Sequence, residues 1–522
     1  MNYVNENNQL SVEEQEMGKC YQDDSLALHT DLYEINMAKS YFKNNMHNRR
    51  AVFETFFRKM PFGGGYAVFA GLERVIDYLA NFRFSETDLD YLYNVLGFEE
   101  EFIDYLKGVR FSGDVQSVVE GEIIFANEPI MRIDAPLLQG QLIETPLLNI
   151  LNFHPLIATK ASRIRLAVGA DTLIEGENAP ALMEFGSRRA HELDAALYGT
   201  RAAYIGGFDS TSNLRAGKIF GIPVSGTHAH ALVQVYRNEY EAFKHYAETH
   251  KDCVFLVDTY NTLRSGVPNA IRVAKEMGDR INFIGIRLDS GKLQYLSKQA
   301  RAMLDEAGFP NAKIFASNDL DEYSITDLKA QGAKIDGWGV GTKLITSYQQ
   351  PALGAVYKLV SIEDENGNMV DTIKLSENPE KISTPGLKSV YRIANTMNGK
   401  WEGDYIAMEN EKPNEEDHLK MFHPVHTHVS KYVTDFRATN IHQNIFAGGE
   451  LVYKEPSIEQ MRAYCLQNLQ YLWDDYKIIS KSDEDVSRPT EYPVDLSTEC
   501  WQNKMHNIEE TRREATRVMQ TR

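Results

Sequence analysis

Side chains that can bind anions, transfer protons or act as nucleophiles are concentrated between residues 183 and 232. Three short apolar runs in this stretch each stop at a polar cluster. The first stops at FGSRR (185–189), the second at DSTSN (209–213) and the third at SGTHAH (225–230). Each run predicts a buried parallel strand that places polar groups at its carboxyl end.

Arginine and histidine supply the most specific chemistry in these segments. Arg188, together with the later Arg287, suits a planar carboxylate because a guanidinium offers paired donors in a fixed geometry. His230 can act as a nucleophile toward phosphorus when one ring nitrogen is free and the other is held by a hydrogen bond. A histidine at a strand end can equally be structural, and His228 is a rival by chemistry.

Three aspartates follow later apolar runs, in CVFLVDTYNT, NFIGIRLDSG and KIFASNDL. Asp258, Asp289 and Asp319 are separated by 31 and 30 residues, about the length of one βα unit. Carboxylates around one pocket repel each other, so they need a divalent cation or the cationic sugar of an oxocarbenium-like transition state. Salt bridges to arginines at the same strand ends are the structural alternative, and both can hold together.

Glycines follow the last of these runs, GWGVGTKL. Gly339 and Gly341 could form only a tight turn. At a late strand end of a barrel, however, glycines allow backbone N–H groups to approach a phosphate, and the helix start beyond them adds a favourable dipole. Thr342 would add its hydroxyl group.

Amphipathic helices are predicted between these strands. In residues 291–308, apolar side chains recur at three- and four-residue spacing and Gly308 stands at the expected helix C-cap. Strands that alternate with such helices run parallel and bury both faces, which favours a barrel or a doubly wound sheet. Polar groups at many successive strand ends favour an irregular TIM-like βα barrel.

The ordered motifs resemble the nicotinate phosphoribosyltransferase family of type II phosphoribosyltransferases. In chain order they are TDLYEINMAKSYF, FRKMPFGGGYAVFAGLE, FGSRRAHELDAA, GGFDSTSN, SGTHAH, DTYN, IRLDSG, ASNDL and VGTKL. They lie between residues 28 and 360, and the similarity is weaker beyond. The resemblance implies an enzyme that joins nicotinate to phosphoribosyl pyrophosphate, with coupled ATP hydrolysis and Mg²⁺ as cofactor.

The resemblance also implies roles for individual residues. His230 would become a phosphohistidine, and Asp258 and Asp289 would be catalytic residues and magnesium ligands. The nicotinate-binding residues would be Tyr33, Phe185, Arg188, Ser212, Thr227 and Arg287, and the phosphoribosyl pyrophosphate-binding residues Asn318, Asp319, Gly339, Gly341 and Thr342. Ser212 stands where related nicotinamide enzymes, which this stretch also resembles, place an aspartate that would repel nicotinate. Lys292 departs from the family's usual RLDSGD, which could weaken metal binding.

Tyr33 belongs to a predicted helix that begins with the pair Asp31 and Glu34. The apolar face of this helix excludes Tyr33, so a partly exposed aromatic side chain is one interpretation. The resemblance instead implies that Tyr33 reaches the nicotinate pocket of a neighbouring subunit. We therefore expect a homodimer with shared active sites.

Composition limits the remaining possibilities. The 522 residues carry a formal net charge of −19, which disfavours nucleic-acid binding and requires a local basic pocket for phosphates. No apolar stretch is long enough to span a membrane and the start lacks signal-peptide features, so a cytoplasmic enzyme with small-molecule substrates is expected. Widely separated free thiols are expected from Cys20, Cys253, Cys465 and Cys500. His423, His426 and His428 are expected to be surface histidines, with a metal site as the alternative.

Four segments are predicted along the chain. Residues 1–25 would form a mobile N-terminal arm, 26–155 an α+β N-terminal domain and 156–360 the catalytic βα barrel. Residues 361–522 would rejoin the N-terminal domain and end in a helical tail. Nicotinate phosphoribosyltransferase is the favoured function. The alternatives are a nicotinamide-specific relative, a sugar-phosphate barrel lyase or isomerase, and a non-enzymatic ligand-binding protein.

Overall fold

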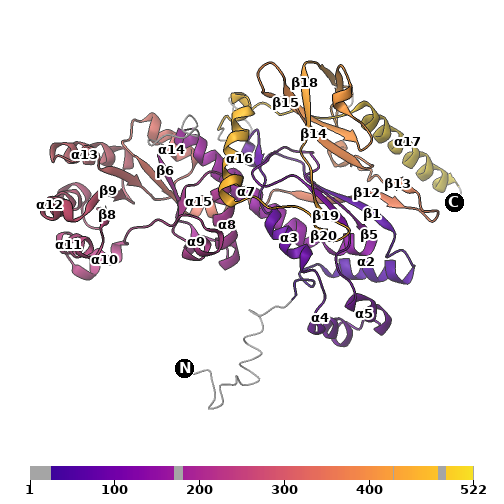
Figure 1. Ribbon diagram of the computed structural model, residues 1–522, viewed down its shortest axis with the longest axis horizontal. Coiled ribbons are helices and arrows are strands. Elements are labelled where there is room, and N and C mark those ends of the chain that lie inside the picture. Colours follow the sequence, from indigo (N-terminus) through magenta and orange to yellow (C-terminus); the bar gives the residue numbers. More distant parts are fainter. Residues whose placement is uncertain (1–24, 170–179, 427, 480–488, 521–522) are drawn as a thin grey trace, which may run out of the picture.

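The computed structural model describes residues 25–169, 180–426, 428–479 and 489–520. Most of the expected N-terminal arm, including Cys20, lies outside these residues. Figure 1 shows a parallel sheet with its helices on one side of the molecule and two further sheets on the other, with the long helices α7 and α16 between them. α7 spans Glu144–Gly169 and α16 spans Ile458–Tyr471.

A six-stranded parallel sheet carries the polar strand ends found in the sequence. Its strand order is β7-β6-β11-β10-β9-β8, and every pairing is parallel. The strands are rich in buried apolar residues because helices cover them. Their bounds are β6 Ala181–Glu184, β7 Ser210–Thr211, β8 Asp252–Leu256, β9 Asn282–Leu288, β10 Lys313–Ala316 and β11 Gly337–Val340.

This sheet is curled like half a barrel, and the irregular TIM-like barrel predicted from the sequence is not confirmed. Beyond β7 the sheet continues only as a single parallel bridge from Thr211 to Val224. In the residues that the structure describes, no strand joins this edge to β8. The strand predicted for residues 222–224 forms only this bridge, and the SGTHAH segment after it continues as a loop into helix α10 (His230–Tyr236).

Helices alternate with the parallel strands as predicted. The periodic segment after Gly291 forms α13, and Gly308 follows it with a φ of +92°, a conformation that glycine adopts without steric cost. The helices that pack around the half-barrel are α8 Leu193–Ile205, α9 Leu214–Phe220, α11 Glu239–Thr249, α12 Val267–Met277, α13 Leu293–Glu306, α14 Glu322–Ala330 and α15 Thr342–Ile345.

A seven-stranded antiparallel sheet combines the two ends of the chain. Its order is β13-β12-β1-β5-β3-β19-β20, so strands after residue 354 pair with strands before residue 137. Helices α2 (Leu32–Lys43) and α6 (Leu137–Leu142) pack together beside it. The strands are β1 Arg50–Phe57, β3 Asp114–Ser117, β5 Met131–Pro136, β12 Ala355–Glu363, β13 Met369–Asp371, β19 Gln443–Ala447 and β20 Glu450–Leu451.

The third sheet has the order β17-β16-β21-β15-β14-β18 and consists of C-terminal strands. The final helix α17 (Thr498–Gln520) packs on β15 and β16. The short β2 (Ala67–Val68) and β4 (Ile123–Ile124) form a separate pair. The third-sheet strands are β14 Lys388–Asn395, β15 Trp401–Met408, β16 Leu419–Phe422, β17 Ser430–Val433, β18 Phe436–Asn440 and β21 Val494–Leu496.

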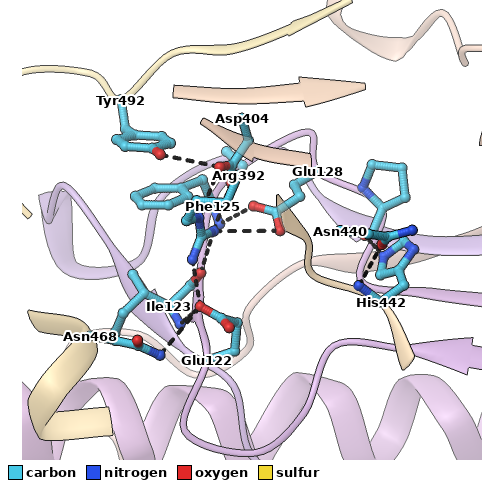
Figure 2. Close-up of polar contacts among 12 residues, drawn as sticks. Glu122, Ile123, Phe125, Glu128, Arg392, Asp404, Asn440, His442, Asn468 and Tyr492 are labelled. Atoms are coloured by element: carbon cyan, nitrogen blue, oxygen red, sulfur yellow. Dashed lines mark hydrogen bonds and ion pairs between the residues drawn. The ribbon is translucent and has the colours of Figure 1, made fainter. Parts of the chain in front are cut away.

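A buried charge cluster joins the third sheet to the N-terminal half of the chain (Figure 2). Arg392 of β14 donates to both carboxylate oxygens of Asp404, at 2.9 and 2.7 Å, to Glu122, and to the carbonyl of Ile123 at 2.8 Å. Tyr492 donates to Asp404 at 3.1 Å. Because these groups come from three distant parts of the chain, the cluster fixes the third sheet in place.

The continuous helix α7 runs from the antiparallel sheet to the half-barrel. Pro155 lies inside it, so the boundary expected between residues 155 and 156 falls within one helix. Lys160 and Arg163, on its second half, both pair with the buried Glu322 at the start of α14, at 2.8 and 3.1 Å. The glycines of PFGGGY pack closely here, since a Cβ on Gly64 would lie 2.9 Å from the Arg163 guanidinium.

Two further sequence expectations concern histidines and membrane spans. The Nδ1 atom of His423 accepts backbone N–H groups from Val425 and His426, at 3.1 and 2.9 Å, so this nitrogen already has partners. Within the described ranges no group of three metal-binding side chains is arranged to hold an ion. The described helices also include none long and apolar enough to cross a membrane.

Candidate active site

The carboxyl ends of the parallel strands meet at one edge of the half-barrel, called here the active edge. Parallel strands place their carboxyl ends on the same side of a sheet. The structure brings nearly all the expected site residues to this edge. They are Phe185 and Arg188 after β6, Ser212 after β7, Asp258 after β8, Arg287 and Asp289 at the end of β9, Asn318 and Asp319 after β10, and Gly339, Gly341 and Thr342 at and beyond the end of β11.

His230 is the first residue of α10 and points toward two of the expected carboxylates. Its Nε2 atom lies 4.0 Å from Asp258 Oδ1 and 3.8 Å from Asp289 Oδ2. Its Nδ1 atom lies 3.0 Å from the Thr259 hydroxyl, which can donate or accept. The His230 side chain is 38% exposed, so the imidazole is both oriented and open to a ligand.

Hydroxyl and backbone N–H groups donate hydrogen bonds to one carboxylate oxygen each of Asp258 and Asp289. Asp258 Oδ2 accepts from the backbone N–H of Asp289 at 2.9 Å and from the Ser290 hydroxyl at 2.5 Å. Asp289 Oδ1 accepts from the Ser317 hydroxyl. The remaining oxygen of each carboxylate is turned toward His230, so the pair forms a fixed anionic wall.

Arginine salt bridges to these aspartates, the structural alternative, do not form in the described part of the chain. The basic side chain within ion-pair distance of both carboxylates is that of His230. Asp258 is only 1% exposed, and its Oδ1 atom has no hydrogen-bond partner. An orphaned buried carboxylate oxygen beside a second carboxylate fits a magnesium ion, which commonly takes one or two protein carboxylates and completes its shell with phosphate oxygens and water.

The structure distinguishes His230 from its neighbour His228. The His228 ring is buried, where its Nε2 atom accepts the backbone N–H of Leu256 at 3.2 Å and its Nδ1 atom lies 3.4 Å from the Ala229 carbonyl. Burial lowers the pKa of His228 to about 4. His228 is therefore a neutral structural residue, and His230 is the histidine available to a substrate.

Arg287, near the end of β9, contacts the loop that carries these histidines. It donates to the His228 carbonyl at 2.8 Å, while its buried Nε atom has no partner. Burial lowers the pKa of Arg287, and the charges of Asp289 and Asp258 oppose this shift. Thr227, in the same loop, donates to the His228 carbonyl at 3.3 Å. A half-buried guanidinium with an unused donor is suited to bind an anion.

The β6 and β7 ends form the other side of the edge. The Phe185 ring lies against Gly339, where a Cβ would come within 2.6 Å of it. Arg188, in the 3₁₀ turn Ser187–Arg189, and Ser212 are both exposed. Gly339 therefore leaves the space that the Phe185 ring occupies.

The β10 and β11 ends have unusual backbone conformations. Asn318 and Asp319 are consecutive residues with φ values of +104° and +41°, which non-glycine residues seldom adopt. α15 begins at Thr342, directly after Gly341. The N–H groups of Leu344 and Ile345 donate to the Gly341 carbonyl, at 3.2 and 3.1 Å, and those of Thr342 and Lys343 precede the first helical hydrogen bond. Strained backbone and open N–H groups at one strand edge are typical of an anion-binding loop.

Tyr33 is the exception among the expected site residues. It lies on α2, which Figure 1 places on the opposite side of the molecule from α10. Its side chain is 49% exposed, and burial with a hydrogen bond to Glu34 raises its pKa to about 12. Within one chain, Tyr33 does not approach the active edge.

Sequence reasoning missed the hydroxyls that contact His230 and the two aspartates. Thr259, Ser290 and Ser317 each contact His230, Asp258 or Asp289. All three stand within the DTYN, LDSG and ASND motifs, directly beside the residues that were identified. Their position next to charged residues at strand ends was the available signal.

Comparisons with known proteins agree with this architecture. Residues 28–152, 181–390 and 387–504 match the models described as the nicotinate phosphoribosyltransferase N-terminal domain, family and C-terminal domain. The chain is 63% identical over 492 residues to the nicotinate phosphoribosyltransferase of Bacillus subtilis, covering 94% of this chain and 97% of that one. It is 37% identical to the Dictyostelium discoideum enzyme of the same name, covering 92% of this chain and 87% of that one.

A solved structure is also similar. The crystal structure of human nicotinic acid phosphoribosyltransferase superposes with a TM-score of 0.78 at 27% identity, covering 91% of this chain and 99% of that one. Sequence similarity at this level over almost the whole length, together with the shared fold, shows the relationship. The chain belongs to the nicotinate phosphoribosyltransferase family.

Proposed function

We propose that the chain is an ATP-dependent nicotinate phosphoribosyltransferase, which forms nicotinate mononucleotide and pyrophosphate from nicotinate and phosphoribosyl pyrophosphate. The observation that carries the proposal is the convergence of arginines, carboxylates and a phosphate-type loop on one edge of the sheet, in a member of this family. The similarity to relatives named for this activity supports it.

The residues of the active edge suit each part of the reaction. Arg287 and Arg188 bind the nicotinate carboxylate, and the Phe185 ring packs on the pyridine ring beside Thr227 and Ser212. Backbone and side-chain groups of Asn318, Asp319, Gly339, Gly341 and Thr342 bind phosphoribosyl pyrophosphate. This divides the edge into a base pocket at β6, β7 and β9 and a phosphate region at β10 and β11.

The bond-making step follows from this placement. The pyridine nitrogen attacks C1 of the ribose as the bond to pyrophosphate breaks, and the electron pair of that bond leaves with pyrophosphate. Asp258 and Asp289 stabilise the positive charge that develops on the sugar, because they are fixed before the reaction begins. They are also the residues that would hold magnesium, which when bound supplies neutralising charge for the leaving group.

His230 couples the reaction to ATP in this proposal. Its ring nitrogen attacks the γ-phosphorus of ATP, ADP leaves with the electron pair of the broken bond, and water later hydrolyses the phosphohistidine. The Thr259 hydroxyl and the two carboxylates hold the ring in orientation. The buried His228 takes no part.

The complete assembly is proposed as a homodimer with shared sites. Tyr33 is exposed and distant from its own active edge, so a two-fold arrangement that brings it to the partner's base pocket would create two equal composite sites. We also infer that the half-barrel is an open form of an irregular TIM-like barrel. We also propose a cytoplasmic location, where the buried free thiols of Cys253, Cys465 and Cys500 remain reduced.

Ser212 distinguishes this function from nicotinamide phosphoribosyl transfer. Its hydroxyl adds no negative charge to the base pocket, so it tolerates the carboxylate of nicotinate. A sugar-phosphate lyase or isomerase would need a Schiff-base lysine or an enolising base at the active edge. The groups identified there are instead histidine, arginine and hydrogen-bonded aspartates.

One assay tests the proposed function. Release of pyrophosphate and ADP is measured with all substrates and then with nicotinate, phosphoribosyl pyrophosphate or ATP omitted in turn. We expect pyrophosphate release to require nicotinate and to be stimulated by ATP. Equal rates with nicotinamide in place of nicotinate, or no dependence on either base, would contradict the proposal.

A further inference from the structure

Glu184 is a buried carboxylate beneath the base pocket that no step of the reaction uses. It is the last residue of β6 and is 1% exposed. Burial raises its pKa, and hydrogen bonds from Thr211, Gly186 and Thr200 oppose this shift, with no cation among the groups that act on it. In the described structure, hydrogen bonds alone stabilise this carboxylate. Burying a carboxylate without a cation costs free energy, so these hydrogen bonds are important for its position.

The three donors to Glu184 come from three different elements. Its Oε1 atom accepts the backbone N–H of Gly186, in the turn that carries Phe185 and Arg188. Its Oε2 atom accepts the hydroxyl of Thr211, at the end of β7, at 2.6 Å. The same oxygen accepts the hydroxyl of Thr200, in the middle of α8, at 3.0 Å.

The backbone reinforces this connection. Glu184 and Thr211 are partners in the parallel register of β6 and β7, and the N–H of Ser212 donates to the Glu184 carbonyl at 3.0 Å. Gly186 passes so close that a Cβ would lie 2.9 Å from Glu184 Oε1 and 2.7 Å from Ile345. The Phe185–Arg188 turn and the Ser212 strand end, which form the two walls of the base pocket, are therefore both hydrogen-bonded to Glu184.

We infer that Glu184 is a positioning residue for nicotinate binding, because its carboxylate fixes the Phe185–Arg188 turn and the Ser212 strand end at one separation. This inference rests on the proposed function. Glu184 does not touch the base. It acts through Gly186 on one wall and through Thr211 on the other, so loosening either bond changes the fit of nicotinate more than the chemistry at the ribose.

The two threonines supply a matched experiment. Thr211 and Thr200 are both fully buried, and both hydroxyls lie within donating distance of the same Glu184 oxygen. The Thr211 hydroxyl also accepts the N–H of Asn213, whereas the single hydroxyl proton of Thr200 is shared with the Ala196 carbonyl. Thr211 adjoins the base pocket, whereas Thr200 lies on α8. The isosteric changes Thr211→Val and Thr200→Val therefore each remove one hydroxyl from the same Glu184 oxygen, at different distances from the base.

The experiment measures kcat and the KM for nicotinate and for phosphoribosyl pyrophosphate, together with the thermal midpoint. For Thr211→Val we expect the nicotinate KM to rise about tenfold, with less than about a threefold change in kcat and in the other KM. For Thr200→Val we expect less than about a twofold change in any kinetic constant and a similar loss of midpoint. Thr211→Ser should restore the nicotinate KM because it keeps the hydroxyl.

The outcomes separate this inference from the proposed function. A wild-type protein without nicotinate-dependent activity would contradict the proposed function before any variant is compared. If the wild type is active, equal nicotinate KM values for the two valine variants would show that Glu184 is only structural, and failure of Thr211→Ser to restore KM would also overturn the inference. Should Thr211→Val fold poorly, direct calorimetric titration of Thr211→Ala and Thr200→Ala with nicotinate makes the same comparison, because alanine also lacks the hydroxyl, and equal affinities contradict the inference.

Discussion

Arg392 and Arg287 both have poorly accessible guanidinium groups, but their hydrogen bonding differs. Arg392 lies in the cluster of Figure 2, where it donates to Asp404, Glu122 and Ile123 and lies 4.1 Å from the centroid of the Trp401 ring. Arg287 donates to one carbonyl and leaves its buried Nε atom without a partner. Asp258 at the active edge likewise has an orphaned oxygen.

The difference shows what each region is for. The Arg392 cluster has its hydrogen-bond partners inside the protein, so it stabilises the contact between the third sheet and the N-terminal half. Unsatisfied buried groups carry a free-energy cost that a ligand can relieve. The half-barrel edge accepts this cost at the positions where the carboxylate of the base and the phosphates are expected to bind.

The largest effect is expected for His230→Asn, which removes the ring that faces Asp258 and Asp289. ATP-dependent phosphorylation of the protein should be abolished, while slow mononucleotide formation without ATP persists because the base and phosphoribosyl sites remain. Acid-labile phosphate on the protein and product formation with and without ATP are measured. Phosphate that still appears on the variant would contradict the assignment and would point to the buried His228.

Arg392→Met should cause the largest loss of stability. It leaves Glu122, Glu128 and Asp404 buried without their cation, which costs about 3 to 5 kcal/mol. Arg287→Met is the matched control, expected to change stability by less than about 1 kcal/mol because it removes one hydrogen bond. Denaturant midpoints of the two variants are compared, and equal losses would show that the two regions do not differ in the way described.

Arg287→Ala should weaken nicotinate binding far more than nicotinamide binding. The guanidinium makes a charge-assisted contact worth roughly 1.5 to 3 kcal/mol that only the carboxylate can use. Competition by each base against labelled nicotinate measures the two affinities. Equal losses would place Arg287 at the sugar or pyrophosphate.

His228 should make stability depend on pH. Its folded pKa of about 4 is lower than the usual value near 6.5, so the unfolded chain binds more protons between these values. The contribution is complete above about pH 6.5 and is lost as the pH falls toward 4. Between pH 7.5 and 5, the wild type should lose about 2 kcal/mol more than His228→Gln, whose amide does not titrate. Denaturant midpoints at the two pH values test this, and parallel losses would disprove the linkage.

The smallest signal is expected from subunit mixing. Tyr33→Ala and His230→Asn proteins are each impaired, but a heterodimer of the two contains one complete site if Tyr33 serves the partner. Random exchange should restore about a quarter of the wild-type ATP-coupled activity, because half of the dimers are mixed and each has one good site. Mass spectrometry confirms the exchange. Mixed dimers with no recovered activity would place Tyr33 outside the partner's site.

The sequence by itself predicted most of the parallel strands and the residues at their ends, although the run before SGTHAH forms only a bridge. An apolar run followed by a polar cluster has one economical structure, a buried strand whose carboxyl end carries the polar groups, and parallel pairing then brings Asp258, Asp289 and Arg287 together. The strand boundaries at Glu184 and Val340 follow the same local pattern. The motif resemblance supplied the chemistry that these residues could perform.

Only the tertiary structure decided which of two adjacent histidines is available. His228 and His230 occupy equivalent local sequence, and burial of the first against Leu256 is a contact between distant residues that local pattern does not reveal. The opening of the half-barrel beyond Val224 and the separation of Tyr33 from the active edge are of the same kind. Each depends on which segments pack together, because packing sets burial, hydrogen-bond satisfaction and the distance between groups far apart in the chain.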